Sequence, residues 1–281
     1  MVSRLAFVIA IALPVVASAK PRWEELPLPP AAPEAQAHGS VESNGANIYY
    51  GIYGKGDPVV LLHGGLGNAD HFSNQIPALA EKFEVIVIDS RGQGRSTMST
   101  TPITYRSMAK DVIGVLDALK IQRASFVGWS DGGEIALALA VDYPDRVDKL
   151  FVFGANYDAH GSKHGSPRTQ TFAAYANKCH SDYLKMSKTP RAYDQVVAAL
   201  APVWRNPAGF TKDDLRAIKA PTMIADGDHD EVIVLDQVEE MSQLIPNAQL
   251  KIFADTSHFA LWQDPDSFNK ALVEFLTSTH P

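Results

Sequence analysis

The chain has 281 residues, of which 46% are hydrophobic and 20% are charged, and its formal net charge at pH 7 is −7. It is long enough to bury one large core or two smaller ones. The mildly acidic balance, without a long basic block, gives no electrostatic footprint for nucleic acid or anionic lipid. The single cysteine, Cys179, excludes an intrachain disulfide.

The first nineteen residues have the pattern of an export signal. Met1 to Arg4 form a short basic start, Leu5 to Val16 form an apolar run, and Ala17 to Ala19 match a small-residue cleavage site. A membrane anchor is the competing interpretation, but the run is short for a span and contains Pro14. We therefore expect a signal peptide over 1–19 that is cleaved near Ala19. Export to the periplasm or beyond follows, with no stable membrane anchor in the mature protein.

Residues 20–40 contain five prolines among Ala and Glu and show no apolar periodicity. This composition predicts an extended, mobile, Pro-rich tether. Organised structure is expected from about Val41, so that 41–281 form the folded domain.

Short apolar runs and amphipathic segments alternate along this domain. The runs predict strands over 47–53, 58–62, 84–89, 124–129, 149–153, 222–226 and 249–253. Helical spacing is found over 69–82, 105–119, 134–141, 235–244 and 265–276. Strands that alternate with helices predict an α/β fold with a mostly parallel sheet covered on both sides.

Residues 155–215 interrupt this alternation. They contain several aromatic residues and loops rich in Gly, Ser, Pro and His, but no clear buried strand. We expect a small helical cap over the site, in which most aromatic side chains form the cap's own core.

The stretch from Gly128 to Gly132 has the pattern Gly-x-Ser-x-Gly between a predicted strand and a predicted helix. This context is that of a nucleophile elbow, in which Ser130 occupies a strained turn and the helix N-terminus points at the reacting group. The Asp131 N–H then faces a developing oxyanion. The alternative is a serine that caps an ordinary helix.

A serine nucleophile needs a base and a group that orients the base. His258 follows the predicted strand 249–253, and an acidic turn follows the strand 222–226. Asp230 is the preferred acid, with Asp228 as the substitute. No histidine spacing in the chain matches a defined metal site, so no metal is expected.

The turn from His63 to Gly67 follows another buried strand and is rich in glycine. Its backbone N–H groups can converge on an anion, and we expect the second oxyanion donor to be Gly65, or else Leu66. A phosphate loop is excluded, because no Gly-Lys-Ser/Thr follows. The Gly-rich segment from Asp89 to Ser96 is expected to be structural, held by Asp89 and Arg91. Leu66, Trp129 and Trp204 are candidate substrate contacts.

From about residue 41 the chain resembles the α/β-hydrolase superfamily, on motifs that occur in the superfamily's order. These are His63-Gly64-Gly65, Asp89-x-Arg91-Gly92-x-Gly94-x-Ser96, Gly128-Trp129-Ser130-Asp131-Gly132-Gly133, Gly227-x-x-Asp230, and Ser257-His258-Phe259 followed by Pro265. It is similar to the lidded branch that includes serine esterases, peroxidase-like enzymes and carbon–carbon hydrolases. The resemblance implies an α/β-hydrolase fold with a cap after the sixth strand, a triad of Ser130, Asp230 and His258, and no cofactor. It also favours Asp230 over Asp228.

These features predict a carboxylesterase that acts on a small-molecule ester. The same triad could act on a lactone, an amide or a carbon–carbon bond. A protein that keeps the triad but senses a ligand is the third interpretation, and slow turnover with a large ligand-dependent stability shift would identify it.

Overall fold

The computed structural model describes residues 20–163, 169–205 and 209–279. The signal peptide expected over 1–19 lies outside these residues and remains a prediction. Within the described ranges, no helix is both long enough and apolar enough to cross a membrane.

Eight strands form one sheet in the order β1-β2-β4-β3-β5-β6-β7-β8. The first two strands pair antiparallel at one edge, β2 pairs antiparallel with β4, and all other pairs are parallel. The predicted mostly parallel α/β sheet is therefore confirmed. The strands are β1 (Ala37–Ser43), β2 (Ala46–Gly54), β3 (Asp57–Leu62), β4 (Phe83–Ile88), β5 (Ala124–Trp129), β6 (Val147–Phe153), β7 (Thr222–Gly227) and β8 (Ala248–Phe253).

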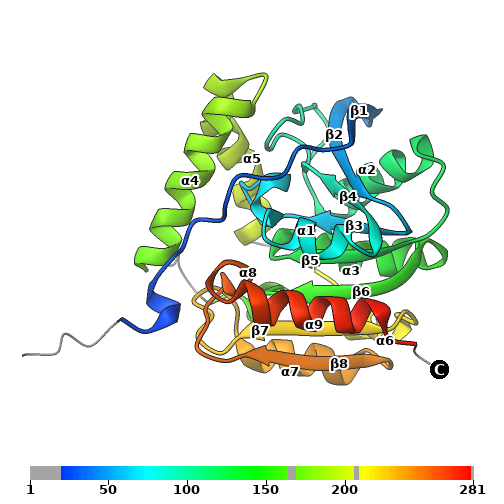
Figure 1. Ribbon diagram of the computed structural model, residues 1–281, viewed down its shortest axis with the longest axis vertical. Helices are drawn as coiled ribbons and strands as arrows, with labels where there is room; N and C mark the ends of the chain where they lie inside the picture. Colours follow the sequence, from blue (N-terminus) through cyan, green and yellow to red (C-terminus); the bar gives the residue numbers. More distant parts are fainter. Residues whose placement is uncertain (1–19, 164–168, 206–208, 280–281) are drawn as a thin grey trace, which may run out of the picture.

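Helices cover both faces of the sheet (Figure 1). The α-helices are α1 (Gln75–Ala80), α2 (Tyr105–Ala118), α3 (Asp131–Asp142), α4 (Gln170–Met186), α5 (Tyr193–Arg205), α6 (Lys212–Ala217), α7 (Leu235–Leu244), α8 (Ala260–Gln263) and α9 (Pro265–Thr277). The short 3₁₀ helices are η1 (Arg22–Glu24), η2 (Ala69–Phe72), η3 (Pro144–Arg146), η4 (Ala159–Gly161) and η5 (Pro190–Ala192).

The two faces have separate cores because side chains of a strand point alternately to opposite sides. Phe126 of β5 packs in the core formed with α2, α3 and α7, whereas the next residue, Val127, packs in the core formed with α1, α8 and α9. Both side chains are buried. The central strands therefore read as continuous apolar runs rather than as alternating ones.

The helix predicted over 69–82 is divided into two pieces, η2 and α1. The Asn68 side chain accepts the N–H of Asp70 and caps η2, and the chain turns through Ser73 and Asn74 before α1 begins. Apolar spacing continues across the break, because Phe72 and Ile76 both contact the same core. The apolar periodicity therefore predicts one helix where the structure has two.

The cap lies between β6 and β7, as the sequence analysis predicts for an insertion after the sixth strand. Its main helices are α4 and α5. Figure 1 shows α4 on the side of the sheet toward which β6 and β8 point. Tyr175, Tyr183 and Leu200 of the cap are buried. Cys179 is buried with them, as a small hydrophobic residue.

The Pro-rich segment 20–36, called the strap below, is fixed to the domain rather than free as its composition predicted. The Arg22 guanidinium pairs with Asp264, Gln263 donates to the Glu25 carbonyl, and the Gln36 N–H donates to the Ile52 carbonyl. Sheet pairing also starts at β1, four residues before the expected boundary at Val41.

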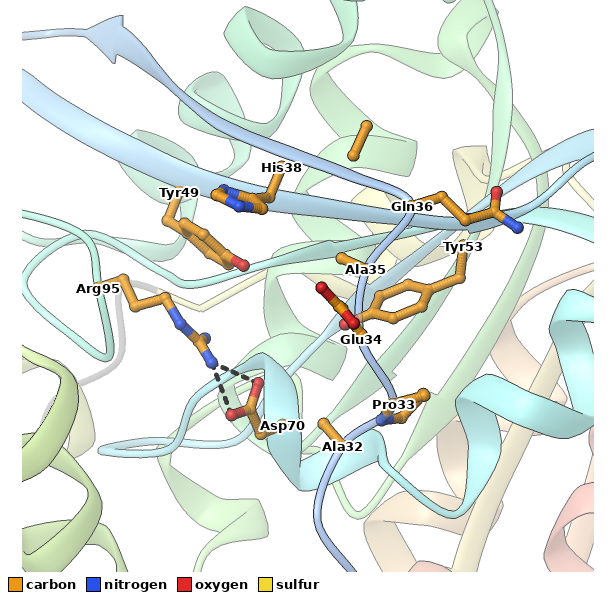
Figure 2. A pocket seen from close by; sticks show the side chains of 11 residues that line it. Ala32, Pro33, Glu34, Ala35, Gln36, His38, Tyr49, Tyr53, Asp70 and Arg95 are labelled. Atoms are coloured by element: carbon orange, nitrogen blue, oxygen red, sulfur yellow. Dashed lines mark hydrogen bonds and ion pairs between the residues drawn. The ribbon is translucent and has the colours of Figure 1, made fainter.

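A hollow of about 530 Å³ lies between the strap and the outer part of the sheet (Figure 2). Its lining includes Tyr49, Tyr53 and the ion pair between Arg95 and Asp70. None of the predicted catalytic residues contributes to this lining. The hollow is therefore separate from the site described next.

Candidate active site

Ser130 lies between the end of β5 and the start of α3, in a backbone conformation with φ 55° and ψ −124°. A non-glycine residue with positive φ is strained by roughly 1–3 kcal/mol and persists only where its surroundings hold it. The Ser130 N–H donates to the Phe153 carbonyl at 2.8 Å, so β6 fixes the turn from the neighbouring strand. The strained serine matches the elbow predicted from the motif.

The elbow glycines are required because strand and helix cross at van der Waals contact. A Cβ atom at Gly128 would lie 2.1 Å from the Gly132 carbonyl oxygen. One at Gly132 would lie 1.9 Å from the Leu62 carbonyl oxygen. Neither position has room for a side chain, and this explains why the Gly-x-Ser-x-Gly motif has glycine at both.

Asp230 and His258 form a buried pair. The His258 Nδ1 and the Asp230 Oδ2 are 2.6 Å apart, and both residues are at most 3% exposed. The other Asp230 oxygen, Oδ1, accepts the N–H groups of Val232 at 2.5 Å and Ile233 at 2.7 Å. These bonds fix the carboxylate, which in turn fixes the imidazole with Nδ1 protonated and Nε2 free to act as a base.

The substitute acid, Asp228, is engaged elsewhere. Its Oδ1 accepts the Thr256 N–H at 3.2 Å, and the same oxygen lies 4.0 Å from His229 Nε2. The structure thus places Asp230, rather than Asp228, against His258.

In the pair of Asp230 and His258, the opposite charge and the hydrogen bond shift each pKa in the direction opposite to the shift caused by burial. Burial alone lowers the pKa of His258, but the Asp230 charge and its hydrogen bond outweigh it and raise that pKa above 6.5. Burial likewise raises the pKa of Asp230, but the charge and hydrogen bond of His258 lower it below its ordinary value. The pair therefore favours an ionised Asp230 beside a histidine that readily takes a proton.

The end of β6 lies beside both Ser130 and His258. The Ser130 N–H is bound to Phe153, and the next residue, Gly154, would place a Cβ 3.0 Å from both Nδ1 and Cε1 of the His258 ring. Among the described residues, no hydrogen bond joins the Ser130 hydroxyl to His258. Such bonds commonly tighten only when substrate is bound.

The turn after β3, for which an oxyanion role is predicted, is held by its own hydrogen bond and lies against the elbow. The Gly67 N–H donates to the Gly64 carbonyl at 3.0 Å, and Leu66 has φ 62°. A Cβ on Gly64 would lie 3.3 Å from the Ser130 Cβ, so the turn faces the elbow. From the cap, the Tyr175 hydroxyl donates to the Gly65 carbonyl at 2.8 Å and holds the turn.

His63 supports this turn from below as a neutral residue. Its Nε2 accepts the Ser90 N–H at 2.9 Å, so its Nδ1 carries the proton and donates to the Gly64 carbonyl at 2.8 Å. Burial lowers the pKa of His63 to about 4. This histidine has a structural role and joins the oxyanion turn to the segment after β4.

Asp131 is the first residue of α3, and its carboxylate is buried. It accepts the Tyr105 hydroxyl at 3.1 Å and the Trp204 indole N–H at 3.0 and 3.1 Å. Burial raises the pKa of Asp131, although both hydrogen bonds oppose the shift. The residue after the elbow serine is thereby linked to α2 and to the cap.

The three candidate substrate contacts differ in position. Trp204 is half-buried, and a Cβ on Gly65 would lie 3.0 Å from its ring, so it packs over the turn after β3, in which Leu66 is also half-buried. Trp129 is 1% exposed, and its indole N–H donates to the His258 carbonyl at 2.9 Å. The prediction for Trp129 is therefore corrected: alternation along β5 turns its side chain into the core formed with α1, α8 and α9.

The Asp89 segment is structural, as expected, but Arg91 acts differently from the prediction. Asp89 accepts the N–H groups of Ala69 and Arg95 at 2.7 Å each, which ties the turn together. Arg91 instead forms a buried bidentate pair with Asp111 of α2, with both distances 2.6 Å. A long-range partner of this kind leaves no mark in the local motif.

Two residues near the site were not singled out from the sequence: Tyr105, which donates to the Asp131 carboxylate, and Tyr175, which donates to the Gly65 carbonyl. The sequence pattern predicts Tyr105 only as part of an amphipathic helix and Tyr175 only as part of the core of the cap. Their hydroxyl groups were the available signal, since a buried tyrosine normally needs a hydrogen-bond partner. The partner itself is set by the tertiary fold.

Comparisons with known proteins identify the family to which the chain belongs. The model of the alpha/beta hydrolase fold family matches residues 57–208 and 170–265. The chain is 30% identical to a 2-hydroxy-6-oxo-6-phenylhexa-2,4-dienoate hydrolase of Comamonas testosteroni, over 82% of this chain and 91% of that protein.

Two solved structures are similar along nearly their whole length. The enol-lactonase of Burkholderia xenovorans LB400 superposes with a TM-score of 0.69 at 26% identity, covering 85% of this chain and 100% of the other. Est816, described as an N-acyl homoserine lactone degrading enzyme, gives a TM-score of 0.66 at 31% identity, with 84% and 100% covered. With the family match spanning most of the domain, the chain belongs to the α/β-hydrolase fold family and is a hydrolase.

Proposed function

We propose that the protein is a serine hydrolase that cleaves carboxylic ester bonds, open or cyclic, in small molecules. The observation that carries this proposal is the buried pair of His258 and Asp230, 2.6 Å apart, beside an elbow that holds Ser130 at φ 55°. A strained serine, a histidine with Nε2 free and an ionised acid behind it are the parts that nucleophilic acyl transfer requires.

In the proposed reaction His258 Nε2 takes the hydroxyl proton as Ser130 Oγ bonds to the ester carbonyl carbon. Asp230 stabilises the resulting imidazolium. His258 then donates its proton to the leaving alkoxide as the ester carbon–oxygen bond breaks, which leaves an acyl-enzyme. A water molecule, deprotonated by His258, attacks the acyl carbon and releases the carboxylic acid and free Ser130.

The oxyanion formed in both steps needs donors fixed before the reaction. We assign this role to the N–H groups of Asp131, at the N-terminus of α3, and of Gly65, in the turn after β3. The strained Leu66 and the bond from Tyr175 to the Gly65 carbonyl support this assignment, because both hold the turn in one conformation.

The relatives bear on which bond is cleaved. Two solved relatives are described as acting on lactones, which are cyclic esters and follow the same chemistry. The similarity to a dienoate hydrolase gives a second candidate, cleavage of a carbon–carbon bond next to a carbonyl group. A panel containing a p-nitrophenyl ester, a lactone and a 2-hydroxy-6-oxodienoate separates the two candidates by relative kcat/KM.

Labelling with a fluorophosphonate tests the nucleophile directly. We expect a single adduct, mapped to Ser130 by peptide mass and absent in Ser130→Ala, together with turnover of p-nitrophenyl esters. By analogy with triad deletions, Ser130→Ala should lose on the order of 10⁴–10⁶ in kcat. An adduct on another residue, or a Ser130→Ala variant that keeps most of its turnover, contradicts the mechanism.

The acidic turn offers a matched control. Asp230→Asn should lose on the order of 10⁴ in kcat, as when the acid of a triad becomes an amide. Asp228→Asn, two residues away, should retain most of its activity, since Asp228 binds the Thr256 N–H instead of His258. Equal losses in the two variants would rule out the assigned acid.

A folded protein that neither labels nor turns over any of the panel would favour the ligand-sensing interpretation. Its signature is a large shift of Tm with a bound carbonyl compound and no product formation.

We also infer export, from the signal sequence pattern of residues 1–19. Mass spectrometry of the protein from a periplasmic or culture fraction should give a mature chain that begins at Lys20. A chain that keeps residues 1–19 and remains in the cytosolic fraction contradicts the proposal.

A further inference from the structure

Glu231 directly follows the proposed acid, and the acyl-transfer mechanism gives its side chain no part. The residue is only partly exposed, although a carboxylate is costly to remove from water unless hydrogen bonds replace the lost solvation. Its two carboxylate oxygens bind different parts of the molecule. One accepts a hydrogen bond from the segment that carries His258, and the other accepts hydrogen bonds from the cap.

On the side of the catalytic pair, the Glu231 Oε2 accepts the backbone N–H of His258 at 3.1 Å. The preceding N–H, that of Ser257, is accepted by the Gln263 side chain at 2.7 Å. Both residues lie between β8 and α8, so side chains rather than a strand or a helix fix this backbone. Gln263 in turn donates to the Glu25 carbonyl of the strap, whereas Glu231 is bound by the cap.

On the side of the cap, two hydroxyl groups at the start of α4 donate to the Glu231 Oε1. Thr171 donates at 2.6 Å and Thr169 at 3.1 Å. Thr169 is also the N-cap of α4, because its hydroxyl oxygen accepts the Phe172 N–H at 3.2 Å. Thr171 is 3% exposed, so bulk water does not compete for its bond to the carboxylate. This end of the cap is thus bonded to the turn that carries the proposed acid.

Aromatic rings pack between the same two parts of the chain. The Tyr175 ring of α4 lies 5.2 Å, between centroids, from the ring of Phe259, the residue after His258. The Phe172 ring lies 6.5 Å from the Phe259 ring. The rings of Phe259 and His258 meet edge to face at 5.7 Å. This packing keeps the start of α4 close to the histidine, and Glu231 adds a polar link to it.

The charged groups around His258 come from several elements. Asp230 pairs with its Nδ1, Glu231 accepts its backbone N–H, and Asp131 lies at the start of α3. Burial lowers the pKa of His258, and the charges of these three carboxylates raise it. Lys163 donates to the backbone carbonyl of Asp230. Other charged side chains of the adjoining segments include buried Asp226, exposed Lys251, and the pairs of Arg22 with Asp255 and Asp264, of His229 with Asp228, and of Lys178 with Asp182.

We propose that Glu231 is a positioning residue that joins the backbone of His258 to the start of the cap helix α4. Because one carboxylate binds both, the base of the reaction is correctly placed only while this end of the cap is seated. The inference rests on the proposed function, since it concerns the base of that reaction. Glu231 acts through the placement of the imidazole, so its effect is on the chemical step.

Two substitutions of Glu231 separate the link from the charge. Glu231→Ala removes both, and kcat should fall about 10-fold or more with little change in KM, because a displaced base slows the chemical step. Glu231→Gln keeps the link, since its amide oxygen can accept the His258 N–H and its NH₂ group can donate to the threonine hydroxyls. It should retain most of kcat. The acid limb of its kcat/KM should move to lower pH, because the negative charge that raises the pKa of His258 is gone.

Substitutions of Thr171 test the link from the cap side. Thr171→Val keeps the shape of the side chain and removes the donor. We expect kcat to fall about 5-fold, less than a whole hydrogen bond to a charged group contributes, because Thr169 still donates. The acid limb should not move, since Glu231 keeps its charge. Thr171→Ser restores the donor and should restore kcat. Thr189→Val, at an exposed threonine of the cap, is the matched control and should leave kcat unchanged.

The double variant decides whether Thr171 acts through Glu231. In the Glu231→Ala background, Thr171→Val should have no further effect on kcat, because the carboxylate that transmits its effect is already absent. Losses that simply add overturn the proposal, as does an unchanged kcat in Glu231→Ala. A loss in Glu231→Gln equal to that in Glu231→Ala would assign the effect to the charge alone and also overturns it.

Amide hydrogen exchange of the full chain tests the link without turnover. With nitrogen-15 in histidine only, the signals come from the nine histidines of the chain, and that of His258 is identified by its loss in His258→Gln. Its backbone N–H should exchange faster in Glu231→Ala and Thr171→Val than in the wild type, and at the wild-type rate in Glu231→Gln and Thr189→Val. Unchanged exchange in Glu231→Ala overturns the proposal.

The threonine variants cover the case in which Glu231→Ala does not fold. Equal exchange rates and equal kcat in Thr171→Val and Thr171→Ser would then overturn the proposal by themselves. If the wild type cleaves no ester, the proposed function fails, while the exchange measurement still decides whether Glu231 holds the backbone of His258 to the cap.

Discussion

The indole N–H of Trp204, in the cap helix α5, donates to the carboxylate of Asp131, the residue directly after the elbow serine, at 3.0 Å. The cap is thus bonded to the element that presents the proposed oxyanion donor. Because the carboxylate is buried, loss of one of its two side-chain donors leaves a charge poorly compensated.

Trp204→Phe keeps an aromatic ring over the site and removes only this N–H. We expect kcat/KM to fall about 10-fold or more, the order associated with a hydrogen bond to a charged group. Tyr193→Phe, at the other end of the same helix, is the matched control and should retain its activity. Steady-state kinetics on one ester checks both, and an unchanged Trp204→Phe would show that the contact is without consequence for catalysis.

Gly154→Ala tests the contact between the residue directly after β6 and His258, the proposed base. Gly154 has φ 60°, and an added Cβ would lie 3.0 Å from Nδ1 and Cε1 of His258. The ring must move away from Asp230 or from Ser130, so we expect at least a 100-fold loss of kcat, since small displacements of catalytic groups have effects of this order. Stability should fall by about 1–2 kcal/mol from the backbone strain.

Gly45→Ala provides the control for that strain. Gly45 also has positive φ, 77°, but its Cβ would meet only Ser99 at 3.4 Å in the turn between β1 and β2. This variant should lose similar stability in urea unfolding and keep its activity. If the two variants lose activity equally, the effect of Gly154→Ala is general strain and not displacement of His258.

Tyr175→Phe tests whether the cap holds the oxyanion turn. The Tyr175 hydroxyl donates to the Gly65 carbonyl at 2.8 Å, and without it the turn loses its bond to α4. We expect kcat to fall about 5- to 10-fold with little change in KM, because the oxyanion donor acts mainly in the transition state. Tyr183→Phe, on the same helix but bonded to Thr189, should leave kcat unchanged. A rise in KM alone would assign Tyr175 to substrate binding instead.

The buried His63 makes stability depend on pH. Burial holds its pKa at about 4 in the folded chain, against 6.5 for an unperturbed histidine. A base with a lowered pKa in the folded state contributes its full stability above pH 6.5, because only the unfolded chain then gains protons as the pH falls. This contribution is lost progressively from pH 6.5 to pH 4 and amounts to about 3 kcal/mol.

Urea unfolding at a series of pH values checks this expectation. His63→Gln should be less stable than the wild type at pH 7 and should have a shallower loss of stability between pH 6.5 and 4. His38→Gln, at an exposed histidine of β1, is the control and should reproduce the wild-type slope. A wild-type-like slope in His63→Gln would place the pH dependence in other groups.

The sequence by itself determined the fold class and singled out Ser130, Asp230 and His258 as the residues proposed to react. Continuous apolar runs alternating with helical segments identified the parallel sheet, because a strand buried on both faces needs apolar residues at every position. The elbow was visible for a similar reason. At Gly128 and Gly132 only glycine fits, because a side chain would collide with neighbouring backbone, so this steric requirement is visible as a short sequence motif.

Contacts between distant segments were decided only by the tertiary structure. That Trp129 packs in the core formed with α1, α8 and α9, that the strap is anchored by Arg22, and that Arg91 binds Asp111 all depend on partners far away in the chain. The local sequence pattern indicates which chemical groups a segment offers. The burial and the hydrogen-bond partners of these groups depend on distant segments, which come together only once the chain is folded.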